Sequence, residues 1–166
     1  TGSLLFQETV TINNYDTAGT VHDKLMKVGA ELVLKTVKAI EAGTAKGEPQ
    51  DLEGEYPHAP KIFRDDCEID WNLPVEKIHN LIRGLSPYPT AWTKLNGKTF
   101  KIYNAEPVQE SHDYEPGFIK TNLSSELLIA ALDGFLKITE VQLEGKRKMS
   151  VEDFLRGYNG AFQINS

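Results

Sequence analysis

The sequence has a single cysteine and no long apolar run. Cys67 stands alone among 166 residues, so an internal disulfide cannot form, which is typical of a reducing compartment such as the cytoplasm. No segment approaches the roughly 20 apolar residues that cross a bilayer, so we expect no membrane partner. The chain starts at Thr1, without an initiator methionine or a visible signal peptide, and we therefore expect a piece of a longer protein.

Positive charge is also scarce. The chain has 18 Lys and Arg against 24 Asp and Glu, which gives a net charge of −6. Sequence-independent nucleic-acid binding depends on neutralising phosphates, so we expect no DNA partner. Most of the positive charge falls within residues 61–166, which leaves room for a local basic patch there.

Short catalytic and metal-binding motifs are missing. The chain has no GxGxxG, P-loop, CxxC or HExxH pattern, and its four histidines are not spaced as metal ligands would be. Four carboxylates surround Cys67 in DDCEID, residues 65–70. They would suit a metal site or flank a cysteine nucleophile, but neighbouring carboxylates raise the pKa of a thiol and blunt its reactivity. We favour a solvated turn and expect no metal.

The first part of the chain predicts a strand and then a helix. Leu4–Ile12 is rich in residues that favour β-structure. Apolar residues then recur every three or four positions from Val21 to Ile40, which predicts a long amphipathic helix. Thr17 is the expected N-cap, and Gly43 is placed to end the helix. Residues 46–60 are rich in glycine and proline and predict a linker.

The remaining residues predict short strands joined by hairpins. Asn96–Gly97 and Asp133–Gly134 each separate two strand-like segments, and both are typical of two-residue turns with positive φ. One short helix is expected from Pro74 and another after Ser150, a candidate N-cap. Several hairpins in succession are typical of a small closed or half-open barrel.

Basic side chains in this part of the chain are candidates for RNA contact, because lysine and arginine are the usual partners of phosphates. Ordinary solvated lysines give the same pattern. Trp92, Phe100 and Tyr103 would stack bases on such a surface, although core packing is the commoner role of aromatic residues on strands. The candidate RNA-binding residues are Lys61, Arg64, Arg83, Lys146, Arg147 and Lys148.

Four segments in consistent order resemble methionyl-tRNA formyltransferase. They are INNYDTAGTVHDKLMKVGAELVLKTVKAIEAG, APKIFRDDCEIDWN, IRGLSPYPTAWTKLNGKTFKIYNAE and GKRKMSVEDFLRG. The second and third are specific to the C-terminal domain of that family, and the resemblance covers nearly the whole chain. Through it, Lys61 and Arg64 match basic positions of the linker region, and Lys146 and Lys148 match the basic approach to the last helix.

The resemblance implies an α+β fragment of a two-domain enzyme. Residues 1–45 would be the strand–helix remnant of a Rossmann-like domain, 46–60 the linker, and 61–166 an OB-like β-barrel. The family transfers a formyl group from 10-formyltetrahydrofolate to the amine of initiator methionyl-tRNA. Its catalytic Asn, His and Asp would lie upstream of Thr1, so we expect no catalytic or folate-binding residue here. The fragment alone is predicted to be inactive.

Two other interpretations stay open. The chain would also suit the C-terminal fragment of a sugar-nucleotide or other folate-dependent formyltransferase, which does not bind RNA. Alternatively it is a free-standing binding module. In that case residues 4–40 would leave a strand edge and an apolar helix face uncovered, and we expect self-association through them.

Overall fold

The computed structural model describes residues 2–51 and 53–164, and the chain forms two compact units, Thr1–Lys61 and Ile62–Ser166. The N-terminal unit is dominated by one helix, α1, Ala18–Glu41. Its start is a reciprocal capping box, in which the Thr17 hydroxyl accepts from the Thr20 amide and the Thr20 hydroxyl accepts from the Thr17 amide. Its end is marked by Gly43 with φ +66°, as predicted.

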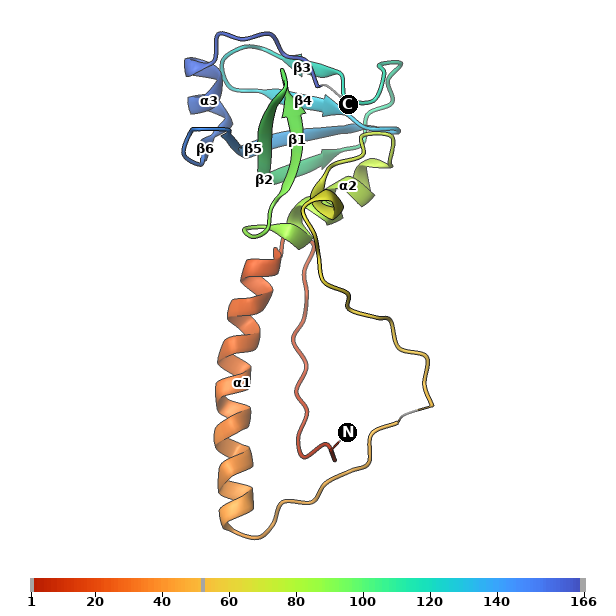
Figure 1. Cartoon of the computed structure of the whole chain (residues 1–166), viewed down its shortest axis with the longest axis vertical. Coiled ribbons are helices and arrows are strands. Elements are labelled where there is room, and N and C mark those ends of the chain that lie inside the picture. The colour runs from red at the N-terminus through yellow and green to blue at the C-terminus, as the bar shows by residue number, and fades with distance from the viewer. Residues whose placement is uncertain (1, 52, 165–166) are drawn as a thin grey trace. The chain divides into compact units, whose positions relative to one another are not determined.

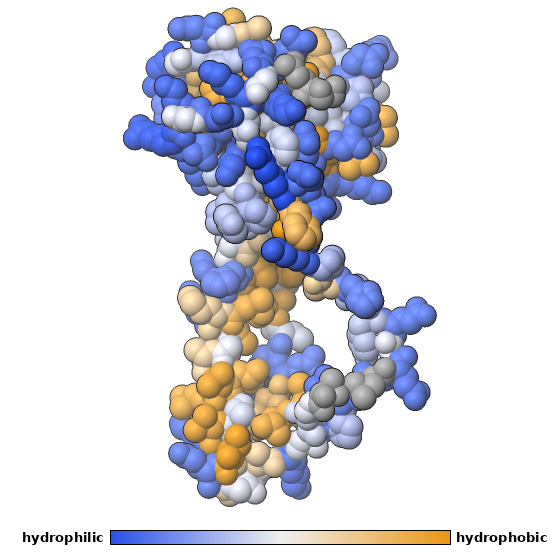
Figure 2. Space-filling model, in the orientation of Figure 1, coloured by the Kyte–Doolittle hydropathy of each residue, from blue (hydrophilic) through white to orange (hydrophobic). Residues whose placement is uncertain are grey.

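Helix α1 buries none of its residues. Apolar side chains such as Leu25, Val33 and Val37 are exposed, Val33 by 64%. Figure 2 shows apolar surface gathered over the helix, in contrast to the mostly hydrophilic visible face of the C-terminal unit. Among the described residues of the N-terminal unit, Asp16 is the one that is buried.

The predicted strand over Leu4–Ile12 is wrong. The segment runs extended beside α1 (Figure 1), but only Leu4 pairs with another backbone segment, through two hydrogen bonds to Glu48 of 2.8 and 2.9 Å. A strand needs a neighbour whose backbone continues the ladder. No other stretch within the described part of this unit supplies one, so the segment keeps an extended backbone without becoming a strand.

The C-terminal unit combines three short helices with a six-stranded sheet (Figure 1). Antiparallel pairing joins the strands in the order β1-β2-β5-β4-β3, and β6 pairs with β5 beyond the end of β4. The helices are η1 (Asp65–Cys67), α2 (Val75–Leu85) and α3 (Val151–Gly157), and the strands are β1 (Ala91–Leu95), β2 (Lys98–Val108), β3 (Ile119–Thr121), β4 (Leu127–Ala130), β5 (Phe135–Leu143) and β6 (Met149–Ser150).

The two predicted hairpin turns differ from each other. Asn96 and Gly97 have φ values of +50° and +75°, which confirms a turn with positive φ at both positions. At the second turn, neither Asp133 nor Gly134 has positive φ, so the prediction of a second turn of this kind is wrong. Gly134 is needed there for a close approach, because a Cβ at this position would lie 2.6 Å from the Val108 carbonyl oxygen.

One core fills the space between α2, α3 and one face of the sheet. Val75, Ile78 and Ile82 of α2 share it with Phe100 and Ile102 of β2, and all five are almost fully buried. Burying each such side chain stabilises the fold by about 1.5–3 kcal/mol. The unit therefore has its own hydrophobic core. No helix among the described residues combines the length and apolar character that a membrane crossing requires.

Candidate RNA-contacting face

The sheet of the C-terminal unit turns one face toward the main core, and its opposite face is outward except near β4, where Leu128, Ala130 and Phe135 form a second buried cluster. Strand register places Trp92 beside Lys101, and Lys101 beside Gln142, across β1, β2 and β5. Phe100, the residue before Lys101, is 0% exposed in the core. Because side chains alternate along a strand, Lys101 lies on the outward face with Gln142.

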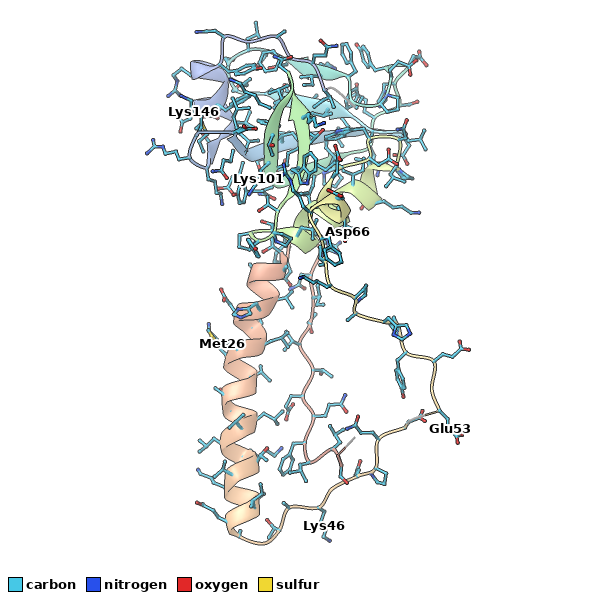
Figure 3. All side chains as sticks on the ribbon, in the orientation of Figure 1. Met26, Lys46, Glu53, Asp66, Lys101 and Lys146 are labelled. Carbon is cyan, nitrogen blue, oxygen red and sulfur yellow. The ribbon has the colours of Figure 1, made fainter. Side chains whose placement is uncertain are left out.

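Basic side chains line this outward face and the turn after β5. Figure 3 labels two of them, Lys101 on β2 and Lys146 in the turn between β5 and β6. Proteins hold an RNA backbone with rows of cations and stack its bases on nearby aromatic rings, and the ring of Tyr103 on this face is partly exposed. We call the following residues the basic strip: Arg64, Lys101, Lys146, Arg147 and Lys148.

Arg64 is fixed against the sheet by both its backbone and its side chain. The indole N–H of Trp92 donates to the Arg64 carbonyl oxygen at 2.9 Å. The guanidinium lies 5.2 Å from the Trp92 ring centroid, within cation–π range, and an Nη2 atom lies 3.5 Å from the Thr99 hydroxyl. Trp92 is therefore buried beneath Arg64, and its ring is not free to stack on a base.

Lys148 occupies the other end of the strip. Its ammonium lies 4.8 Å from the Tyr103 ring centroid and 2.8 Å from a Glu140 carboxylate oxygen. The Tyr103 hydroxyl donates to the Gln142 side-chain oxygen at 2.8 Å. Both partners of this ion pair are nearly half exposed, so the pair contributes little stability.

The turn between β5 and β6 presents the rest of the strip. Gly145, with φ +75°, allows the chain to reverse. The Lys146 backbone is tied on both sides, because its amide donates to Leu143 and its carbonyl accepts from the Gln142 side chain. Lys146 and Arg147 are exposed, and neither forms an ion pair within the described ranges. Their charges therefore face solvent.

Carboxylates interrupt the positive charge of the strip. Glu144 accepts from the Thr99 amide at 2.9 Å. This hydrogen bond, helped by the Thr99 hydroxyl and by the nearby charges of Lys98 and Arg64, lowers the pKa of the Glu144 carboxyl below its usual value. Glu144 is thus ionised at neutral pH, and phosphate binding to the strip must compete with it.

The structure does not bring all six predicted residues together. Arg64, Lys146, Arg147 and Lys148 lie on the basic strip. Arg83 instead lies on α2, where its Nε donates to the Asn80 side chain at 2.7 Å, and α2 packs against the buried face of the sheet. Lys61 ends the N-terminal unit, three residues before Arg64 along the chain.

From the sequence, Lys101 is one of three lysines around the first hairpin that could contact RNA phosphates, with Lys94 and Lys98, but it is not among the six candidate residues. The hairpin at Asn96–Gly97 fixes the register that sets Lys101 between Trp92 and Gln142, so this turn was the available signal. Of the three aromatic residues considered for stacking, Phe100 is fully buried and Trp92 is covered, whereas Tyr103 is half-buried under Lys148.

Neither a metal site nor a reactive cysteine is present in the described residues. No group of three or more His, Cys, Asp and Glu side chains there could hold a metal ion. Cys67 is 1% exposed, and its burial, with the negative charge of Asp66, raises the pKa of the thiol. Asp66 accepts from the Phe63 amide, which makes DDCEID the turn that we favoured.

Comparison with known proteins gives one consistent family. A family model described as formyl transferase, C-terminal domain, matches residues 61–159. The chain belongs to this family. Methionyl-tRNA formyltransferase from Phocaeicola vulgatus is 46% identical over 167 aligned residues, which cover 95% of this chain and 52% of that protein. The Bacillus licheniformis protein of the same name is 43% identical, with 94% and 49% coverage.

This member of the formyl transferase C-terminal domain family thus spans about half the length of its curated relatives, and matches their C-terminal half. Among solved structures, HypX from Aquifex aeolicus in complex with tetrahydrofolic acid has a TM-score of 0.69 at 20% identity, covering 99% of this chain and 31% of HypX. WlaRD, a sugar 3N-formyl transferase, has a TM-score of 0.56 at 22% identity, covering 89% of this chain and 51% of WlaRD. These two likenesses show the fold.

Proposed function

We propose that the chain is the tRNA-contacting half of a methionyl-tRNA formyltransferase, an enzyme that formylates the amine of initiator methionyl-tRNA in the cytoplasm. The observation that carries this proposal is the basic strip on the outward face of a formyltransferase C-terminal domain. The relatives at 40–46% identity bear this enzyme's name, whereas the sugar formyltransferase WlaRD matches at 22%. This difference favours tRNA over a sugar nucleotide as the substrate.

The domain organisation that we propose follows from the same family. Residues 61–166 form an OB-like barrel, which the antiparallel strand order supports. Residues 1–45 are a remnant of a Rossmann-like catalytic domain, joined through a linker at 46–60. The uncovered apolar face of α1 supports this role, and self-association through residues 4–40 stays a prediction that sedimentation velocity would test.

Catalysis would then belong to the other half of the enzyme. Formyl transfer needs a group that manages the amine proton and donors that stabilise the tetrahedral oxyanion. The basic strip holds cations and aromatic rings but no such pair. We propose that 10-formyltetrahydrofolate, the co-substrate, binds outside this chain and that the chain alone is inactive. A formyl-transfer assay with methionyl-tRNA should give no product, and any turnover by the purified chain would contradict the proposal.

tRNA binding is tested by removing charge from the basic strip. Anisotropy titrations of labelled initiator tRNA at several salt concentrations would compare the chain with its Lys146/Arg147/Lys148→Ala variant. The slope of log affinity against log salt should fall by about 1 for each phosphate that the variant no longer neutralises. A matched control, Lys27/Lys35/Lys38→Ala, removes the same charge from α1 and should leave the slope unchanged. If both variants lower the slope equally, tRNA binding depends on the net charge of the chain and not on a site at the basic strip.

A further inference from the structure

The corner after α2 presents a large side chain to solvent. Tyr88 is 85% exposed, although it stands between Pro87 and Pro89. Each proline fixes its own φ. The Thr90 hydroxyl donates to the Pro87 carbonyl at 2.6 Å, and the Thr90 amide donates to the Leu85 carbonyl at 2.9 Å. The corner therefore holds Tyr88 outward on a rigid support, where its ring adds little to the stability of the core.

Beside Tyr88 lies a hollow of about 330 Å³ that borders the basic strip. Its walls come from the segment before η1, the Pro87–Thr90 corner and strands β1 and β2. A volume of this size is at the lower end of the range for sites that bind small molecules. The side chains that matter for its chemistry are Phe63, Tyr88, Arg64, Thr99 and Lys101.

The hollow has both an aromatic side and a cationic side. Tyr88 and Phe63 are exposed by 85% and 61% and offer ring surface, while Arg64 and Lys101 supply positive charge. Of the carboxylates beside the hollow, Asp66 accepts from the Phe63 amide and Glu144 accepts from the Thr99 amide. Neither Arg64 nor Lys101 forms an ion pair among the described residues, so the lining favours a ligand that is flat at one end and anionic at the other.

We propose that this hollow holds one unpaired nucleotide of the RNA, with its base against Tyr88 and Phe63 and its phosphate against Arg64 and Lys101. The inference rests on the proposed tRNA binding and assigns a specific contact to it. Proteins read unpaired RNA bases by stacking them on aromatic side chains, whereas paired bases are stacked within their own helix. The site should therefore distinguish single-stranded from double-stranded RNA.

The test uses the chain with two labelled probes, a 12-nucleotide single-stranded RNA and the blunt duplex formed from it. The variants are Tyr88→Ala, which removes the ring, and Tyr88→Phe, which keeps it. The chain should bind the single strand more tightly than the duplex. Tyr88→Ala should lose about fivefold or more in affinity for the single strand and nothing for the duplex, and Tyr88→Phe should behave as the parent. Because Tyr88 is exposed, thermal unfolding should be unchanged in both variants.

Three results would overturn the inference. Unchanged single-strand affinity in Tyr88→Ala would do so, as would an equal loss for both probes. If Tyr88→Ala changes the sedimentation coefficient of the chain but leaves its RNA affinity unchanged, the corner makes a protein–protein contact instead. If the parent chain binds neither these probes nor tRNA, the proposed function itself fails, which is a different result from RNA binding that ignores Tyr88.

Discussion

The two units of this chain use amphipathic helices in opposite ways. In the C-terminal unit, α2 buries most of its apolar face, with Val75 and Ile78 at 0% exposure. In the N-terminal unit, the longer helix α1 buries no residue, and Val33 is 64% exposed. A helix stripe is stable only when another layer covers it. The C-terminal unit therefore has its own hydrophobic core, whereas in the described part of the N-terminal unit no second layer covers α1.

The contrast between the two units is tested most strongly by truncating one apolar side chain in each unit. Phe100→Ala removes a fully buried ring that packs 5.1 Å from Phe154, and it should lower the free energy of unfolding of the C-terminal unit by about 3–5 kcal/mol. Val33→Ala on α1 is the matched control and should change stability by no more than about 0.5 kcal/mol. Urea unfolding followed by tryptophan fluorescence and circular dichroism measures both.

Comparable losses in the two variants would contradict the comparison, because they would mean that the apolar face of α1 is already covered. Both tryptophans, Trp71 and Trp92, are buried in the C-terminal unit, so their fluorescence reports on that unit alone. Circular dichroism adds the helical signal of α1.

The sequence predicted several local elements of both units. Thr17 and Ser150 cap their helices through their hydroxyls, and Asn96–Gly97 forms the predicted turn. Each depends on neighbouring residues only. The capping of α2 could not be predicted in this way, because the Val75 amide donates to Asp133, 58 residues further along the chain. The failed strand at Leu4–Ile12 has the same origin, since a strand depends on partners that local sequence does not reveal.

Only part of the candidate site could be predicted, because some of its residues come together through contacts between distant parts of the chain. Lys146–Lys148 is a run of adjacent charges, which a sequence displays directly. Lys101 joins the basic strip only through strand register, and Arg83 is excluded from it because α2 packs against the other face of the sheet. Tyr88 is absent from the predicted candidates, because only its exposure in the folded chain suggests a contact.

A smaller effect, confined to the N-terminal unit, comes from its one buried carboxylate. The Asn13 amide and the Lys24 ammonium hold the pKa of Asp16 at about 2. The pKa of Asp16 in the folded chain is lower than its value of about 3.9 in the unfolded chain. The ionised carboxylate therefore stabilises the fold fully above about pH 3.9, and this stabilisation is lost as the pH falls through about 2. In thermal unfolding followed by circular dichroism, Asp16→Asn should have a lower melting temperature than the parent above pH 5. The difference should shrink toward pH 2.

The matched control for this titration is Asp23→Asn, which removes a carboxylate that is 70% exposed. It should melt like the parent throughout. A gap between Asp16→Asn and the parent that stays constant between pH 5 and pH 2 would show that the ionised carboxylate of Asp16 does not support the start of α1.

The most direct test of the account is to separate the two units. Residues 61–166, which contain the core and the basic strip, would be compared with the whole chain by thermal unfolding and by titration with labelled initiator tRNA. We predict one cooperative unfolding transition and a tRNA affinity within about twofold of the whole chain, because the hydrophobic core and the basic strip both lie within these residues. Failure of residues 61–166 to fold, or a loss of about tenfold or more in tRNA affinity, would contradict the account.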